Sequence, residues 1–365
     1  MAVLTYMIGN GFDINLGLKT TYSDFIESYL KTESRNEQID EFKGIIRKEI
    51  KDDPATWADA EMAFGKLTAA FIDKPNPGQY FNMCQEDFCN ALSEYLNKQQ
   101  NRLTGELLNA NESKINSINN ALVGIADALR PVQKDAVMQE LNNCGQGFDI
   151  YTLVFNYTNT VEKVLGASKS PWGKRRWNDT NYENRMFGVT QPHGTINQDM
   201  VFGVNDTSQI SCLEIFKNDE INLNVFIKEK TNEMNGEYLE EKSVGILSKS
   251  DAIYIYGMSL GETDRRWWER IIKLMKEKPH LCVIIYDYEA PLPGVMNSGY
   301  ERRKRRIQDI MLSYDQSLSA EEGDKLRERL FVDPQNKFKP LQNMVPDPLK
   351  AAYLERAKKE IQKQK

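Results

Sequence analysis

The sequence predicts an α/β protein with a Rossmann-like, mainly parallel sheet and a large helical insertion after the first strand. Short apolar runs, rich in β-branched and aromatic residues, recur along the chain without the alternation of half-exposed strands. Segments with helical periodicity separate these runs. A glycine-containing turn directly follows the first run. Strands that alternate with helices favour a parallel sheet covered on both faces.

The strand candidates differ in strength. The strong ones are dense apolar runs at residues 3–8, 150–155, 252–256 and 281–286, and the weaker ones are 186–189 and 200–202. Because the strong runs are apolar on both sides, we expect their strands to be buried on both faces.

The segment between the first two strong strands has mostly helical periodicity. Thr21 with Asp24 forms a capping-box signature at its start. Helices are expected within 57–71, 80–96 and 113–129, with a breaker at Pro75-Asn76-Pro77-Gly78. This insertion either covers a pocket or serves as a scaffold.

The second half of the chain completes the expected architecture. Residues 172–184 are polar and irregular, which predicts a loop, and residues 264–278 predict a helix. We expect a core formed by residues 1–20 and 146–300, a helical insertion at 21–145 and a C-terminal helical extension at 301–365.

Composition narrows the function classes. The net charge of −6 does not favour nucleic acid or an anionic membrane as a partner. Five cysteines without a C-x-x-C pair argue against a disulfide framework or an all-cysteine zinc site. Two histidines cannot build a histidine-rich metal site, and no metal is predicted, although a carboxylate site stays open. We expect a cytoplasmic protein without a signal peptide or membrane span.

The turn after the first strand is the first candidate site. Gly9 and Gly11 would let the backbone approach a ligand phosphate, with Asn10 and Phe12 beside them and Asp13 at the start of a helix. The third glycine of the dinucleotide fingerprint is missing. The alternative is a tight turn that Asp13 caps.

Three further constellations follow predicted strands. Asn156 and Thr158 could hold a ribose hydroxyl or cap the next helix. His193 with Gly194 offers a base near neutral pH or a structural turn. A last group permits close backbone approach or caps a helix, and it consists of Gly257, Ser259 and Asp264. In a parallel sheet such strand ends can converge on one crevice.

A Gly-x-Ser-x-Gly pattern and a basic run are both interpreted as structural or surface features and not as functional sites. Gly257 to Gly261 matches a bare Gly-x-Ser-x-Gly nucleophile elbow, but only His280 follows it, and His280 is interpreted as a surface turn residue. The basic run at residues 302–306 is more typical of a solvated helix face than of a nucleic-acid contact.

Several motifs together resemble the AbiH family of bacterial phage-defence proteins. They are Ile8 to Asp13, Gly17 to Thr20, Tyr22 to Phe25, Trp57 to Glu61, Phe155 to Thr158, His193-Gly194 and Gly257-x-Ser259-Leu260 with Asp264. The resemblance spans roughly residues 4 to 270 and implies a role in abortive infection.

The same order of motifs is more distantly similar to sirtuin-like NAD-consuming domains. That resemblance implies that Asn156 and His193 sit beside the nicotinamide ribose. Gly-Asn-Gly-Phe-Asp replaces the sirtuin Gly-Ala-Gly-x-Ser, and no zinc module is recognised, so protein deacetylation is not expected.

Three functions follow as hypotheses. The first is an NAD glycohydrolase that cleaves the N-glycosidic bond of NAD or a related nucleotide, with Asn156, His193 and Asp13 as catalytic residues. The second is a non-catalytic nucleotide-sensing module that signals through a protein partner. The third is a nucleic-acid-acting toxin, which the acidic pI disfavours. A phage-derived trigger is expected, and homo-oligomerisation stays open.

Overall fold

The computed structural model describes residues 1–347 except 170–171, 178–179, 218, 237 and 293–297. Its centre is a six-stranded sheet with the order β5-β2-β1-β6-β7-β8, in which every pairing is parallel. The strands are β1 (Ala2–Ile8), β2 (Phe148–Val154), β5 (Arg185–Thr190), β6 (Ala252–Tyr256), β7 (Cys282–Tyr286) and β8 (Leu330–Asp333). The predicted parallel α/β sheet is therefore confirmed.

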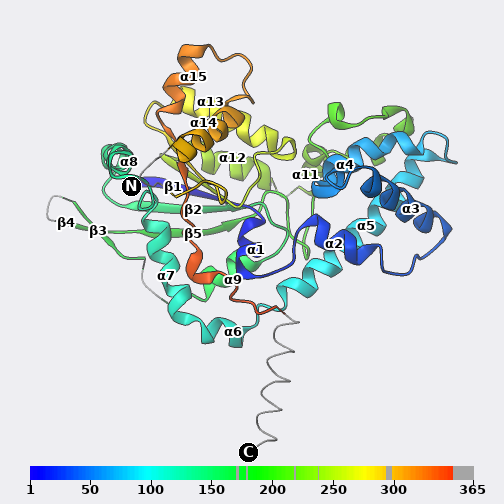
Figure 1. Ribbon diagram of the computed structural model, residues 1–365, viewed down its shortest axis with the longest axis horizontal. Helices are drawn as coiled ribbons and strands as arrows, with labels where there is room; N and C mark the ends of the chain where they lie inside the picture. The colour runs from blue at the N-terminus through cyan, green and yellow to red at the C-terminus, as the bar shows by residue number, and fades with distance from the viewer. Residues whose placement is uncertain (170–171, 178–179, 218, 237, 293–297, 348–365) are drawn as a thin grey trace, which may run out of the picture.

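Both faces of the sheet are covered, which explains the apolar runs. Alternate residues of β1, such as Leu4 and Tyr6, join a cluster with α7 (Glu112–Val123) and α8 (Pro131–Cys144). Met7 points to the opposite face, where α12 (Leu239–Lys249), α13 (Arg265–Glu277) and α14 (Ser298–Leu312) pack. Figure 1 shows α12 to α15 (Ala320–Arg327) on one side of the sheet and α7 with α9 (Thr160–Gly166) on the other.

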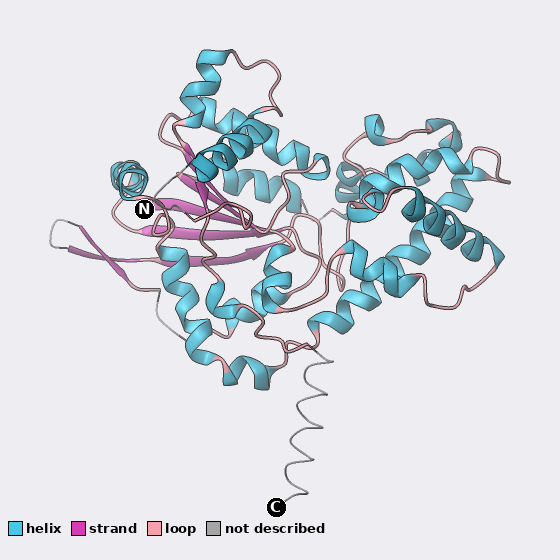
Figure 2. Cartoon of the chain, viewed as in Figure 1, coloured by secondary structure: helices cyan, strands magenta, loops and turns pink. Residues whose placement is uncertain are grey.

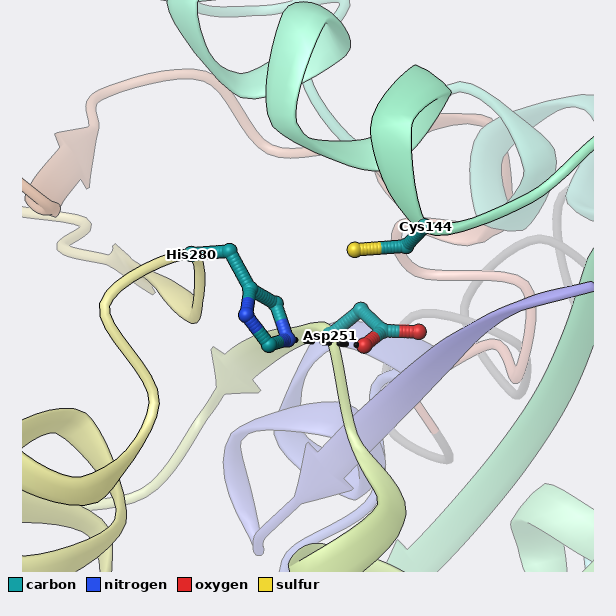
Figure 3. A group of neighbouring side chains, drawn as sticks. All are labelled: Cys144, Asp251 and His280. Carbon is teal, nitrogen blue, oxygen red and sulfur yellow. Dashed lines mark hydrogen bonds and ion pairs between the residues drawn. The ribbon is translucent and has the colours of Figure 1, made fainter.

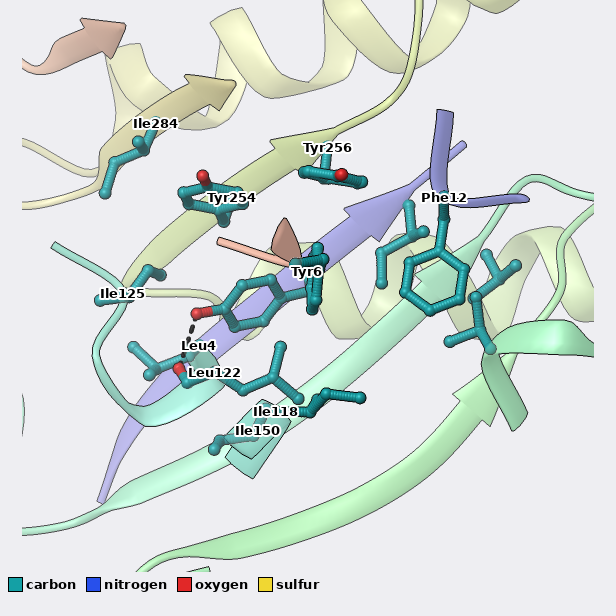
Figure 4. Packing of buried hydrophobic residues seen from close by; sticks show 14 of the residues in the cluster. Leu4, Tyr6, Phe12, Ile118, Leu122, Ile125, Ile150, Tyr254, Tyr256 and Ile284 are labelled. Carbon is teal, nitrogen blue, oxygen red and sulfur yellow. Dashed lines mark hydrogen bonds between the residues drawn. The ribbon is translucent and has the colours of Figure 1, made fainter. Parts of the chain in front are cut away.

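The cluster that contains Leu4 and Tyr6 also contains other tyrosines, and their buried hydroxyl groups donate hydrogen bonds to nearby acceptors. Tyr6 lies 5.3 Å from Tyr254 between ring centroids, and its hydroxyl donates to the carbonyl oxygen of Leu122 at 2.6 Å (Figure 4). The Tyr254 hydroxyl donates to Asp333 at 2.6 Å. A buried tyrosine keeps its apolar contact area without a desolvation penalty when its hydroxyl has a partner.

The predicted helical insertion divides into two parts. Helices α2 (Tyr22–Tyr29), α3 (Glu37–Asp52), α4 (Ala60–Leu67) and α5 (Pro77–Gln100) form a separate lobe, whereas α6 (Gly105–Ala110), α7 and α8 return to the sheet. The lobe also includes α10 (Glu220–Phe226) and α11 (Lys228–Asn235), which follow β5 in the chain. It lies beyond the carboxyl ends of the strands, as Figures 1 and 2 show.

Local signals explain where these helices begin. The Thr21 hydroxyl accepts from the backbone N–H of Asp24 at 3.0 Å, as the capping signature predicts. Helix α5 begins at Pro77 because the breaker places Asn76 in a left-handed conformation. Asp59 caps α4, so the predicted 57–71 helix is interrupted at this residue.

Two local predictions are wrong. Residues 172–184 contain an antiparallel hairpin, β3 (Lys174–Trp177) and β4 (Thr180–Glu183), instead of a loop. Residues 200–202 form no strand, because Val201 N–H donates to the His193 carbonyl and the segment packs against the helical lobe. The C-terminal extension contains α14 and α15, and it also contributes β8, which pairs with β7.

The segment after β8 returns to the start of the fold. The Phe338 ring packs against Phe12 of α1 (Gly11–Leu16) at 5.4 Å. Asn15 Nδ2 donates to the Phe338 carbonyl at 2.9 Å, and Val345 N–H donates to the Leu16 carbonyl at 2.8 Å. Within the described ranges, none of the helices is both long and apolar enough to cross a membrane.

Candidate functional site

The sheet order determines where a ligand would bind. Counting only strands of the large sheet, the order corresponds to 3-2-1-4-5-6. Successive strands are added toward one edge from β1 and toward the other edge from β6, so the strand order reverses between β1 and β6, although all strands run parallel. In such sheets ligands bind outside the carboxyl ends of the strands at this reversal. The predicted site residues follow β1, β2, β5 and β6, so the structure brings all four constellations to this edge.

The two glycine turns at the reversal pack against each other. Gly11 N–H donates to the Gly257 carbonyl at 2.8 Å, and Gly9 N–H donates to the Tyr256 backbone carbonyl at 2.8 Å. Gly257 has a φ of 65°, and a Cβ there would lie 2.6 Å from the Gly11 Cα. Glycine is therefore required by the contact between two loops, a reason that holds with or without a phosphate.

Two side chains in the first turn are occupied inside the protein. Asn10 Nδ2 donates to the Thr20 carbonyl at 2.9 Å, and Asn10 Oδ1 accepts from the Thr20 hydroxyl at 2.6 Å. Phe12 is buried in the core against Phe338. Their predicted nucleotide contacts would have to come from backbone atoms or from a rearranged turn.

Asp13 joins α1 to the loop after β2. Its carboxylate is buried and accepts hydrogen bonds from the hydroxyls of Thr158, at 2.5 Å, and Thr160. Burial raises the pKa of Asp13 to about 6, while these hydroxyls and the Asn156 amide offset part of that rise. Asp13 caps no backbone group of α1, contrary to the alternative drawn from the sequence.

The side chain of Asn156 is buried at this edge without its hydrogen bonds being satisfied. It lies beside Asp13, close enough to lower the pKa of that carboxyl, yet neither its nitrogen nor its oxygen makes a hydrogen bond of normal geometry with the described residues. The loop itself is well held, since Gln191 Nε2 donates to the Asn156 carbonyl at 2.7 Å and to the Thr158 carbonyl at 3.1 Å. A buried amide without partners carries a desolvation penalty that a bound ligand or water can relieve.

His193 follows β5 in a rigid turn. Gly194 has a φ of 66° and packs against the Asp199 carbonyl, so a side chain at Gly194 would clash there. The His193 ring is 8% exposed and meets Phe155, the neighbour of Asn156, edge to face at 5.4 Å. Burial, followed by the charge of Lys228, lowers the pKa of His193 well below its usual value. The imidazole is therefore neutral near pH 7 and offers a basic nitrogen, although burial makes it a weaker base than an exposed histidine.

The last predicted constellation is more open. Ser259 is exposed, whereas Asp264 is half-buried at the start of α13. Burial raises the pKa of Asp264 to about 6, Lys228 opposes that rise and Asp59 adds to it. Asp264 therefore lies within electrostatic reach of two charged groups of the helical lobe.

Those lobe residues form an acid–base cluster that the sequence reasoning assigned no role. Lys228 Nζ contacts Glu61 Oε2 at 2.6 Å, and both side chains are 5% exposed. Glu61 also accepts from the Tyr157 hydroxyl at 2.8 Å. Asp59 accepts from the Thr263 hydroxyl beside Asp264. Asp59 and Glu61 fall in the Trp57 to Glu61 motif, which was the available signal; nothing in the sequence marks Lys228.

Opposing influences set the charges in this cluster. Burial raises the pKa of Glu61 to about 7, although Lys228 pulls it down. Burial alone would lower the pKa of Lys228, but Glu61, Asp264 and Asp59 outweigh it, so the pKa is raised and the ammonium stays charged. The edge thus combines a neutral imidazole, an unpartnered amide and carboxyls that titrate near neutrality, a set suited to acid–base chemistry.

The basic run at residues 302–306 is largely paired. Arg303 contacts Asp287 at 2.5 Å and Glu289 at 2.8 Å, and Lys304 contacts Glu301 at 2.7 Å. This pairing favours the interpretation of a solvated helix face.

The strand order and this edge define a doubly wound α/β protein of the kind that binds ligands at a topological switch point. The family model described as "Bacteriophage abortive infection AbiH" matches residues 5–286, and the chain belongs to this family. Membership supports a role in the abortive-infection response to phage. Searches among curated proteins and among solved structures give no match.

Proposed function

We propose that this protein hydrolyses the N-glycosidic bond of NAD or a related nucleotide during phage defence. The observation that carries the proposal is the buried, unpartnered amide of Asn156 at the carboxyl edge of β2. An amide both donates and accepts, so it suits the adjacent hydroxyls of a ribose. The 3-2-1-4-5-6 strand order supports a dinucleotide across the same edge.

The proposed roles follow from the protonation states. Asn156 holds the nicotinamide ribose or positions the attacking water. His193, neutral near pH 7, accepts a proton from water or a ribose hydroxyl. Asp13 stabilises the positive charge that develops on the sugar, to the extent that it is ionised. The more distant resemblance to sirtuin-like domains supports the same two roles for Asn156 and His193.

The rest of the nucleotide would lie along the glycine turns. Gly9, Gly11 and Gly257 keep the backbone accessible to a pyrophosphate once the two turns separate, and Gly194 keeps the His193 turn compact. Thr158, Ser259 and Asp264 supply the polar side chains at this edge.

The test combines a purified assay with infected cells. The full chain is incubated with NAD and free nicotinamide is measured, and NAD is followed in cells that express the chain before and after phage infection. Asn156→Ala and His193→Ala should each lower nicotinamide release at least about 100-fold. Asn181→Ala, an exposed asparagine on β4, should leave it unchanged. Nucleotide binding without nicotinamide release, both in vitro and in infected cells, would contradict the proposal.

A second candidate is a non-catalytic nucleotide sensor. The glycine turns contact each other and His193 is 8% exposed, so ligand entry requires the edge to open. Such opening could pass to the helical lobe, because Tyr157 next to Asn156 bonds to Glu61 of α4. This candidate predicts that nucleotide raises the melting temperature without turnover, and that His193→Ala changes affinity only.

A further inference from the structure

A group of metal-binding residue types lies at the opposite edge of the sheet. Cys144 ends α8, Asp251 precedes β6 and His280 precedes β7, and their side chains point toward one another (Figure 3). One ligand atom from each lies within 4.8 Å of the other two. His280 Nε2 is 3.1 Å from Asp251 Oδ1. These residues are far apart in the chain, so no ligand spacing is visible in the sequence.

The surrounding backbone orients the carboxylate. Asp251 Oδ2 accepts from Val3 N–H at 2.8 Å, which leaves Oδ1 directed at His280. The backbone of Asp251 is held as well, because its N–H donates to the Val3 carbonyl at 2.9 Å and its carbonyl accepts from Cys282 N–H at 3.2 Å. Hydrogen bonds of this kind, made by the oxygen that is not a ligand, fix a carboxylate for metal binding.

The end of α8 is also held in place. Gly145 N–H donates to the Leu141 carbonyl at 3.2 Å, and a Cβ on Gly145 would lie 2.6 Å from the backbone nitrogen of Ala2. The helix end therefore packs directly on the start of β1, and Cys144 reaches the group from a fixed backbone position.

We propose that Cys144, Asp251 and His280 bind a zinc ion, with water in the fourth position. Sulfur, imidazole nitrogen and carboxylate oxygen are the ligands zinc uses, at about 2.0–2.3 Å, whereas calcium and magnesium require oxygen ligands. A tetrahedron with those bond lengths needs ligand atoms about 3.3–3.8 Å apart. The Asp251–His280 separation of 3.1 Å is already shorter than this, and no separation has to contract by more than about 1 Å.

The position of the ion differs from that of the nucleotide edge and indicates another role. A zinc ion here would connect α8, the last helix of the insertion, to the starts of β6 and β7. The His280 side chain is 36% exposed, so the ion can enter from solvent. The ion would stabilise the amino edge of the sheet without touching Asn156 or His193.

The test uses cobalt as a spectroscopic probe of the full chain. The purified protein is stripped with chelator and titrated with Co²⁺, then with Zn²⁺ in competition with a chromophoric chelator. We expect one equivalent of Co²⁺ to give a thiolate charge-transfer band and tetrahedral ligand-field bands, displaced by one equivalent of Zn²⁺. Cys144→Ser should abolish the charge-transfer band, and His280→Gln should weaken Zn²⁺ affinity by at least about 10-fold.

A matched control separates ligation from general thiol reactivity. Cys212 is a similarly half-buried cysteine outside the group, so Cys212→Ser should keep the band and the affinity. Zn²⁺ should raise the melting temperature of the parent and of Cys212→Ser, but not that of Cys144→Ser. A parent without a charge-transfer band, or a band that survives Cys144→Ser, would overturn the proposal.

Discussion

Above pH 7, where Glu61 with its pKa of about 7 is mainly ionised, replacing it by glutamine would leave the buried ammonium of Lys228 without its anionic partner. Glu61 lies on α4 and Lys228 at the start of α11, and the contact between them is 2.6 Å with both side chains 5% exposed. Glutamine keeps the shape of the side chain and an acceptor for the Tyr157 hydroxyl, so the change removes mainly charge.

The expected cost follows from the burial of the pair. Removing one partner of a buried ion pair typically costs 3–5 kcal/mol, because the other charge stays desolvated. Asp59 and Asp264 still lie within electrostatic reach of Lys228, which places the expected loss near the lower end, about 3 kcal/mol. With a urea slope of about 3 kcal/mol/M, the unfolding midpoint of the lobe should fall by about 1 M.

The measurement is urea unfolding, at about pH 8 so that Glu61 is mainly ionised, of the parent, Glu61→Gln, Lys228→Met and the double variant. The double variant should be more stable than Glu61→Gln, because it contains no unpaired buried charge. Glu214→Gln, in an exposed pair with Lys217 at 3.0 Å, should change stability by at most about 0.5 kcal/mol. If Glu61→Gln shifts the midpoint no more than Glu214→Gln does, the ion pair does not stabilise the lobe and the reasoning fails.

Three other perturbations test the candidate site. Gly257→Ala should lower the free energy of unfolding by at least about 2 kcal/mol, because its φ is 65° and its Cβ would meet Gly11. In the same urea series, Gly245→Ala should be neutral or stabilising, because Gly245 lies on α12 with open space around it. Burial raises the pKa of Asp13 to about 6 in the folded protein, so its ionisation lowers the stability of the parent as pH rises through about 6. The free energy of unfolding of Asp13→Asn should therefore rise by about 2 kcal/mol relative to that of the parent between pH 4 and pH 7. Parallel stability profiles of the two proteins over this pH range would contradict the prediction. Tyr157→Phe removes a hydroxyl with two acceptors and should lower stability by about 1–2 kcal/mol in thermal unfolding; an unchanged melting temperature would show that these bonds contribute nothing net.

The strands that the sequence predicts well are those buried on both faces. The strands at residues 3–8 and 252–256 can be predicted without knowing their neighbours, because a continuous apolar run is stable only when both of its faces are buried. Strand β8 escaped prediction because it has four residues within a charged segment and is specified by pairing with β7. The hairpin at 174–183 is polar, and cross-strand pairing forms it without an apolar pattern.

Some residues of the candidate site could likewise be located from the sequence, and others could not. Asn156 and His193 could be located because each follows a strand, and parallel strands share a carboxyl edge. Glu61 and Lys228 could not, because only the folding of the lobe brings α4 and the first residue of α11 together. The unmet hydrogen bonds of Asn156 are likewise a property of its surroundings and are invisible in the residue itself.

The helical lobe is assembled from two stretches of chain, residues 22–100 and the segment around 196–235, with β2 and β5 made between them. During synthesis, α2 to α5 therefore leave the ribosome before the residues that complete their core exist. At about 5–20 residues per second, the lobe waits on the order of ten seconds for α10 and α11. The faces of Phe64 and Phe81 that meet Phe202 and Phe226 lack those partners over that interval, so chaperone demand in the cell should fall on this nascent lobe before the sheet is complete.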